Sequence, residues 1–213
     1  MDPAFWLRCW QQDQLGWQLD AVHPLLSQAP ADWLDHRPVF VPLCGKSPDL
    51  LFLAQHAAVT GVELSELACT DFFRENGLAM DSSQDVGFVR SQAANICLYQ
   101  GDYFALAQAH VAACKRIYDR AALIALPGPM RQSYVRHLKK LMPKADMLLL
   151  SLEYPAGEKQ GPPFSVTAAE IKELFDFATI SQLQQRDLTG QGFARRRFDT
   201  STLIETSWRI QWN

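Results

Sequence analysis

Short apolar runs alternate with longer amphipathic segments along the central part of the chain. Five of the runs have the length of a strand, and most of the segments between them are compatible with helices. This alternation is typical of a parallel sheet covered by helices on both faces. The predicted strands are Val39–Leu43, Val59–Glu63, Ile96–Gln100, Arg116–Asp119 and Met147–Tyr154, and the predicted helices are Pro48–His56, Leu64–Asn76 and Met130–Leu141.

The two ends of the chain differ from this pattern. Residues 1–35 are predicted to form an irregular helical preface rich in aromatic side chains. Trp6 and Trp10 are four residues apart and therefore share one face of a helix. Near the other end, Thr179–Gln184 and Leu203–Trp212 read as strands without a long helix between them, which predicts an antiparallel hairpin at one edge of the sheet.

Length and charge narrow the class of protein. At 213 residues the chain can bury an ample core, and we expect one domain over residues 1–213. It carries 20 basic and 23 acidic side chains, a net charge of −3, so nothing favours a nucleic-acid partner or an anionic membrane surface. Its apolar runs are too short to cross a bilayer, and its first residues lack a signal-peptide pattern. These features predict a cytoplasmic protein.

Several side chains that often carry chemistry have an ordinary interpretation here. The five cysteines are scattered, without a C-x-x-C pair, and the five histidines lack metal-ligand spacing, so we expect no metal site. Cys44 has no histidine near it in the sequence and is expected to pack rather than to act as a nucleophile. The run Arg195-Arg196-Arg197 is expected to be solvated or to protect a sheet edge, and contact with an anionic acceptor stays as a lesser alternative.

The stretch from Val39 to Glu63 is typical of half a nucleotide-binding βαβ unit. A first apolar run leads into Pro42-Leu43-Cys44-Gly45-Lys46-Ser47, a turn with one glycine, and a second run ends at Glu63. An acid at the end of the second strand is placed to accept hydrogen bonds from the two hydroxyls of a ribose. We therefore assign Glu63 and Gly45 to a cofactor site.

Polar residues also follow the third and fourth predicted strands. Ligands of an open parallel sheet bind beyond the carboxyl ends of its strands, where the strand order reverses. Asp102 and Tyr103 follow the third strand, and Asp119 and Arg120 end the fourth, so we expect these residues at one rim with Glu63. Two alternatives stay open. Asp102 could cap a local turn, and Arg120 could form a structural ion pair with Asp119.

The residues at this rim favour one class of cofactor. A pyrophosphate needs several glycines and a free helix N-terminus, whereas the turn at Gly45 has one glycine, and no G-x-x-x-x-G-K-[ST] pattern is present. S-adenosylmethionine has an adenine, a ribose and a cationic sulfonium but no phosphate, so it fits carboxylates and apolar walls better. A nicotinamide-dependent oxidoreductase stays as an alternative, because it shares the acid after the second strand.

Six strings of residues, in order, resemble those of the bacterial thiopurine S-methyltransferases. They span residues 5–175, and the rest of the chain matches only loosely. The strings are Phe5-Trp6 through Trp10, Val41-Pro42-Leu43-Cys44-Gly45-Lys46-Ser47, Gly61-Val62-Glu63-Leu64-Ser65-Glu66-Leu67, Phe72-Phe73, Tyr118-Asp119-Arg120-Ala121-Ala122-Leu123 and Gly161-Pro162-Pro163-Phe164-Ser165-Val166.

The resemblance implies a class I methyltransferase fold, a three-layer αβα Rossmann-like sandwich whose mostly parallel sheet has seven strands. It implies a monomeric enzyme that methylates the sulfur of thiopurines or other aromatic heterocyclic thiols and converts S-adenosylmethionine to S-adenosylhomocysteine. For bacterial members it extends to selenium or tellurium oxyanions. The natural acceptor does not follow from the sequence, and a non-catalytic protein that binds S-adenosylmethionine stays as an alternative.

The resemblance also assigns roles to residues of the cofactor site. Trp10 and Leu43 would line the region of the methionine and the ribose. Glu63 would hold the ribose hydroxyls, as the strand pattern already predicts. Asp102 and Tyr103 would border the adenine.

A second group of residues is assigned to the acceptor. Arg120 would lie near both the cofactor and the acceptor and act in catalysis. Trp17 in the preface, together with Pro163 and Phe164, would cover the acceptor. Family members commonly carry a Phe-His pair where this chain has Trp17-Gln18. This departure bears on the shape and polarity of the acceptor pocket.

Overall fold

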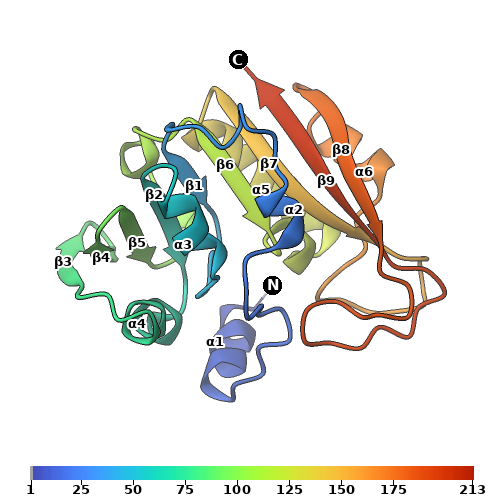
Figure 1. Cartoon of the computed structure of the whole chain (residues 1–213), viewed down its shortest axis with the longest axis horizontal. Helices are drawn as coiled ribbons and strands as arrows, with labels where there is room; N and C mark the ends of the chain where they lie inside the picture. Colours follow the sequence, from blue (N-terminus) through green and yellow to red (C-terminus); the bar gives the residue numbers. More distant parts are fainter. Residues whose placement is uncertain (1) are drawn as a thin grey trace.

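The computed structural model describes residues 2–213, and its strands form one nine-stranded sheet in the order β3-β4-β5-β2-β1-β6-β7-β9-β8 (Figure 1). Met1, which the predicted domain and preface include, lies outside the described residues. The strands are β1 (Val39–Val41), β2 (Val59–Glu63), β3 (Asp81–Asp85), β4 (Phe88–Ala93), β5 (Ile96–Gln100), β6 (Arg116–Arg120), β7 (Ala145–Glu153), β8 (Thr179–Asp187) and β9 (Ile204–Trp212).

The centre of the sheet is the parallel arrangement that the apolar runs predict. Strands β5, β2, β1, β6 and β7 pair in parallel, in the order of a doubly wound nucleotide-binding sheet. Strand β7 is buried along nearly its whole length, as expected of a strand covered on both faces. The strand order reverses between β1 and β6, which places a ligand site at the carboxyl ends of these two strands.

Both edges of the sheet are antiparallel. Strand β9 pairs with β7 and β8, which confirms the predicted C-terminal hairpin. At the opposite edge, β3 and β4 form a hairpin that pairs with β5. The expected number of seven strands was therefore wrong. Strand β3 is polar and largely exposed from Asp81 to Asp85, so it has no apolar alternation that could reveal it in the sequence.

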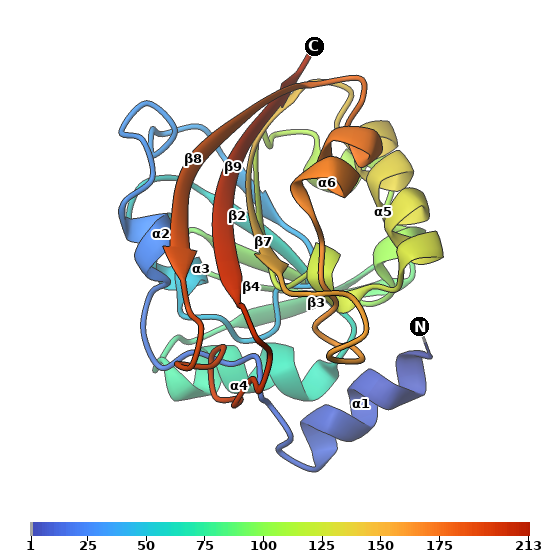
Figure 2. The same ribbon diagram turned by 90° about the vertical axis from the view of Figure 1, so that its right-hand side faces the viewer.

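Helices lie on both faces of the sheet, with α5 and α6 on one side and α2 and α3 on the other (Figure 2). The three predicted helices are present as α3, α4 and α5. Among the described residues, no helix is long and apolar enough to span a membrane. The helices are α1 (Pro3–Gln11), α2 (Pro24–Ser27), α3 (Asp49–Ala54), α4 (Glu66–Glu75), α5 (Gly128–Leu141) and α6 (Ala168–Leu174), with 3-10 turns at Tyr103–Ala105, Gln108–Val111 and Leu123–Ala125.

An ionic cluster fastens the preface to the amino end of β6 and β7. Arg116, the first residue of β6, is fully buried, pairs with Asp146 and with Asp35 at 2.9 Å, and lies over the ring of Trp33. Arg209 pairs with Asp146 at 2.7 Å. The cluster lies at the opposite end of β6 from its last residue. The preface is thus anchored at the amino end of the strands, and its earlier residues can reach the carboxyl end.

Candidate active site

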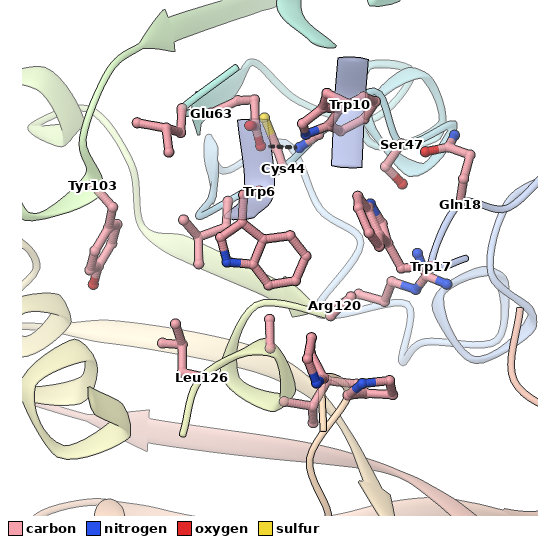
Figure 3. Close-up of a pocket in the computed structure, with 18 of the residues that line it drawn as sticks. Trp6, Trp10, Trp17, Gln18, Cys44, Ser47, Glu63, Tyr103, Arg120 and Leu126 are labelled. Atoms are coloured by element: carbon pink, nitrogen blue, oxygen red, sulfur yellow. Dashed lines mark hydrogen bonds between the residues drawn. The ribbon is translucent and has the colours of Figure 1, made fainter. Parts of the chain in front are cut away.

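A cavity of about 210 Å³ opens at the carboxyl ends of β1, β2 and β6, where the strand order reverses (Figure 3). Its walls come from the preface, from the segments that follow these strands and from two loops late in the chain, and most of them are apolar. The structure brings together most of the predicted site residues. Those that line the cavity are Trp10, Trp17, Leu43, Gly45, Glu63, Asp102, Tyr103, Arg120 and Pro163.

Glu63 ends β2, and the backbone of two loops orients its carboxylate. The N–H of Gly45 donates to Oε2 at 3.0 Å, and the N–H of Ser65 donates to Oε1 at 2.8 Å; Figure 3 shows the first of these bonds. Burial raises the pKa of Glu63 above its ordinary value, although the backbone hydrogen bonds act in the opposite direction. Each carboxylate oxygen retains acceptor capacity for a donor in the cavity.

The turn after β1 packs closely against α1. Leu43 and Gly45 have φ angles of +48° and +54°, in the left-handed region. A Cβ atom on Gly45 would lie 3.2 Å from the Trp10 indole, so this close approach favours glycine. The turn is also held from outside, because the Lys46 ammonium pairs with Glu75 of α4 at 2.8 Å. Gly45 and Trp10 thus form one closely packed part of the cavity wall.

Three tryptophans of the preface form one wall of the cavity. Trp6 and Trp10 lie on α1, and Trp17 follows in the next loop. The ring of Trp17 meets the other two edge to face, with centroid separations of 5.1 Å to Trp6 and 5.8 Å to Trp10. This arrangement presents a large, rigid apolar surface opposite the sheet.

Gln18 connects the preface to the turn after β1. Its Nε2 donates to the carbonyl oxygens of Lys46 at 3.1 Å and Leu19 at 3.2 Å. Gln18 is buried and lines the cavity beside Trp17 (Figure 3). The Trp17-Gln18 departure from the family pattern therefore lies directly at the site.

Arg120 ends β6 and brings a guanidinium to the cavity. Its Nε and one Nη are buried and have no hydrogen-bond partner among the described residues. The structural alternative, an ion pair with Asp119, does not form in the described part of the chain, because Asp119 accepts from Tyr134 and from the N–H of Leu123 instead. Buried donors without partners cost free energy unless a ligand satisfies them. Arg120 thus offers two donors and a positive charge to a ligand.

Arg196 is a second guanidinium at the cavity and was not predicted as a site residue. One Nη donates to the carbonyl oxygen of Pro162 at 2.7 Å, and the guanidinium lies 6.0 Å from the ring centroid of Trp17. The expected solvated run therefore has one member that faces the site. No local signal marks it, because its position depends on the packing of three segments far apart in the sequence.

Asp102 and Tyr103, which follow β5, have a structural role and also form part of the cavity wall. The Asp102 carboxylate accepts from the N–H of Phe104 at 3.0 Å, so Asp102 caps the 3-10 turn as in the alternative interpretation. It nevertheless lines the cavity. Tyr103 is buried, and its hydroxyl donates to the carbonyl oxygen of Tyr134 at 3.1 Å.

The loop at 161–164 contributes less than predicted. Pro162 and Pro163 line the cavity, and the Pro163 carbonyl oxygen accepts from the Tyr154 hydroxyl at 2.8 Å. Phe164 does not line the cavity. Its ring lies beneath the guanidinium of Arg131, 5.8 Å from ring centroid to Cζ, and its N–H donates to the carbonyl oxygen of Ile124.

Nucleophilic and metal chemistry have little support at this site. Cys44 lines the cavity, but burial raises the pKa of its thiol well above the usual range, which keeps it protonated. Among residues 2–213, no group of three or more His, Cys, Asp and Glu side chains is placed to hold a metal ion. The charged groups that line the cavity are the Glu63 and Asp102 carboxylates, which accept hydrogen bonds, and the Arg120 and Arg196 guanidiniums, which donate them.

These groups fit S-adenosylmethionine. An oriented carboxylate with spare acceptor capacity suits a ribose diol, and the apolar walls that include Trp10 and Leu43 suit a methylthio chain. Among the described residues that line the cavity there is no glycine-rich helix N-terminus, which is the usual cradle for a pyrophosphate.

Comparison with known proteins gives a consistent result. The sequence profile of the thiopurine S-methyltransferase family matches residues 1–212. A protein named thiopurine S-methyltransferase from Shewanella pealeana is 47% identical, and the alignment covers 99% of this chain and 98% of that protein. One of the same name from Pseudomonas paraeruginosa is 43% identical over 99% of both chains.

Solved structures share the fold at low sequence identity. A methyltransferase from Anabaena variabilis that depends on S-adenosylmethionine matches with a TM-score of 0.68 and 20% identity, over 99% of this chain and 95% of its own. A 1,6-didemethyltoxoflavin N1-methyltransferase from Burkholderia thailandensis, solved with S-adenosylhomocysteine, matches with a TM-score of 0.64 and 12% identity, over 99% and 87%. The sheet and its helices thus have the class I methyltransferase arrangement.

Proposed function

The chain belongs to the thiopurine S-methyltransferase family and is a methyltransferase that uses S-adenosylmethionine, and we propose that it methylates the sulfur of thiopurines and related aromatic heterocyclic thiols. Family membership replaces the alternatives of a nicotinamide oxidoreductase and a non-catalytic binding protein. Part of the proposal is that residues 1–213 form one domain whose preface covers the site. The monomeric state and the cytoplasmic location stay predictions.

The observation that supports this acceptor class is the environment of Arg120. Arg120 has two unpartnered buried donors and lines a cavity whose walls are mostly apolar and also include Glu63. A heteroaromatic thiolate has both matching properties, a flat apolar ring and a negative charge. A guanidinium binds such a group by charge, by hydrogen bonds and by stacking.

When bound, S-adenosylmethionine supplies a methyl group on a positively charged sulfur. In our proposal Glu63 accepts hydrogen bonds from the ribose hydroxyls, and Trp10 and Leu43 pack against the rest of the cofactor. Arg120 holds the acceptor as its thiolate in line with the methyl carbon. Fixing two reactants in this way contributes up to roughly 7–11 kcal/mol in favourable cases.

The apolar walls have a role of their own in this scheme. An anionic sulfur and a cationic sulfonium give two neutral products, so charge is lost along the reaction. Walls such as Trp6, Trp10 and Trp17 exclude water that would otherwise stabilise the charged reactants. No general base is needed, because a heteroaromatic thiol is substantially ionised near neutral pH.

A selenium or tellurium oxyanion is a second candidate acceptor. The observation in its favour is that Arg120 and Arg196 both present guanidiniums to the same cavity. Two cations suit a small anion as well as a thiolate.

A panel of acceptors tests the proposal. Transfer of labelled methyl from S-adenosylmethionine is measured with 6-mercaptopurine, selenite and a plain alkyl thiol. We expect the thiopurine to react and the alkyl thiol to react much more slowly, because it is mostly protonated and has no ring for Arg120. Arg120→Ala should lower turnover without loss of folding. Equal rates with both thiols, or an unaltered rate in folded Arg120→Ala, would contradict the proposed role of Arg120.

A further inference from the structure

Asp119 carries a buried carboxylate directly beneath the site. It precedes Arg120 at the end of β6, and both Asp119 and its partner Tyr134 of α5 are fully buried. The Tyr134 hydroxyl donates to Oδ2 at 2.6 Å, and the N–H of Leu123 donates to Oδ1 at 3.1 Å. The Asp119 carboxylate thus connects the segment that follows β6 to helix α5.

The segment that this carboxylate holds is a wall of the cavity. Residues 120–126 contribute Arg120, Ala121, Ile124, Ala125 and Leu126 to the lining, and Figure 3 shows Arg120 and Leu126 on it. The segment begins with a sharp reversal in which Ala121 has a φ angle of +66°. A left-handed conformation at a residue with a Cβ costs about 1–2 kcal/mol and persists only where neighbouring contacts enforce it.

We propose that Asp119 is a positioning residue for methyl transfer: as a carboxylate held by Tyr134, it fixes the turn at residues 120–126 and thereby the direction of the Arg120 guanidinium. The inference rests on the proposed S-methyl transfer. Arg120 itself makes no hydrogen bond through Nε and one Nη within the described chain, and its guanidinium lies over the ring of Phe193, 5.6 Å from Cζ to the ring centroid. Its direction therefore depends on this ring contact and on the backbone that carries the side chain. That backbone is held at Asp119 on one side and at Leu123 on the other.

An ionised Asp119 in this buried position costs free energy of desolvation, whereas a neutral acceptor could hold the same turn without that cost. Its hydrogen-bond partners are uncharged, and the titratable side chains that face it are Tyr134 and Tyr103. Burial raises the pKa of Asp119 to about 6, against the hydrogen bond from Tyr134, which lowers it. Asp119 is therefore ionised near neutral pH and becomes protonated in mild acid.

The test compares Tyr134→Phe and Asp119→Asn with the control Tyr118→Phe. Tyr118 is also buried on β6 and its hydroxyl also donates to a carboxylate, that of Asp49 at 2.8 Å, but it does not line the cavity. Three quantities are measured for each chain: folding by circular dichroism, affinity for S-adenosylhomocysteine, and kcat and KM with 6-mercaptopurine. The Nε–H signal of Arg120, assigned by its loss in Arg120→Lys, is followed by NMR against pH.

We expect Tyr134→Phe and Asp119→Asn to lower kcat by about 10- to 100-fold, the range typical of small misplacements, with a much smaller change in cofactor affinity. The Arg120 signal should titrate near pH 6 in the unaltered chain. The midpoint should move to higher pH in Tyr134→Phe, stay in place in Tyr118→Phe and disappear in Asp119→Asn.

Three results would overturn the inference. These are an unchanged kcat in folded Tyr134→Phe and Asp119→Asn, a parallel loss of cofactor affinity and turnover, and an Arg120 signal that is insensitive to Asp119. The NMR arm also separates the two proposals. A chain that methylates no thiol would reject the proposed acceptor, while the Arg120 titration would still decide whether Asp119 positions the guanidinium.

Discussion

Glu63 shows how one side chain of this site is prepared before any ligand binds. Two backbone N–H groups from different loops, those of Gly45 and Ser65, fix its carboxylate, and burial raises its pKa. Glu63 could be predicted from the sequence, because the first strand, the glycine turn and the acid that ends the second strand lie close together in the chain. The orientation of its carboxylate could not be predicted, because it depends on a hydrogen bond from Gly45, which lies in the turn after β1.

Replacing Glu63 with Gln should raise the dissociation constant of S-adenosylhomocysteine at least tenfold, because a hydrogen bond to a charged acceptor contributes about 1.5–3 kcal/mol. Calorimetry measures the change. Glu66→Gln is the matched control, since Glu66 is an exposed acid in the first turn of α4, and it should bind normally. Equal affinities in the two variants would remove Glu63 from the cofactor site.

The same carboxyl predicts a pH dependence of binding. Ribose donors favour the ionised form, so affinity is complete above the pKa of Glu63 and decreases as the pH falls through it. Because burial raises this pKa, the decrease should begin at a higher pH than for an ordinary glutamate. Calorimetry from pH 8 down to pH 5 measures it. The decrease should be absent in Glu63→Gln, and its persistence there would assign it to another group.

At the scale of elements, the strands that flank the reversal of strand order have a common feature. The turns after β1 and β6 each contain a residue with a Cβ in the left-handed region, Leu43 and Ala121, and both line the cavity. Strained backbone of this kind concentrates at functional sites. The sequence predicts the two strands but not these conformations, because leucine and alanine rarely adopt them.

Ala121→Gly should raise the free energy of unfolding by about 0.5–1 kcal/mol, since glycine adopts a positive φ without strain. It should also lower kcat, because the turn that carries Arg120 becomes less rigid. Denaturant unfolding and steady-state kinetics measure the two effects. Ala122→Gly is the control, because Ala122 has a φ of −82° and glycine there should destabilise the fold. Destabilisation by Ala121→Gly would contradict the assignment of strain.

The elements that the sequence did not reveal depend on long-range contacts. Strand β3 has no apolar alternation and is defined by its pairing with β4. Arg196 lies in an arginine run that reads as solvated, yet packing against Gly16, Trp17 and Pro162 places it at the cavity. Local patterns predict elements and strand-end residues, whereas contributions from distant loops require the folded chain.

At the scale of the whole molecule, binding and anchoring are divided between the two ends of the sheet. The cavity lies at the carboxyl ends of the central strands, and the cluster around Arg116 and Asp146 lies at the amino ends of β6 and β7. The preface spans both, because its tryptophans line the cavity while Asp35 pairs with Arg116. Stability and cofactor binding should therefore respond to different substitutions.

Asp146→Ala should lower the free energy of unfolding by about 3–5 kcal/mol, because it leaves the fully buried Arg116 without a main partner. Cofactor affinity, measured by calorimetry well below the melting temperature, should stay unchanged. Asp32→Ala removes an exposed partner of Arg209 and serves as the control, with only a small loss of stability. Similar losses in both variants would show that the buried cluster is not the anchor.

The most direct test of the account is the position of the transferred methyl group. The chain is incubated with 6-mercaptopurine and S-adenosylmethionine carrying a ¹³C-labelled methyl, and the product is examined by NMR. We expect a single methyl resonance on sulfur and formation of S-adenosylhomocysteine in equal amount. A methyl on a purine nitrogen, or no transfer while S-adenosylhomocysteine still binds, would contradict the proposed S-methylation.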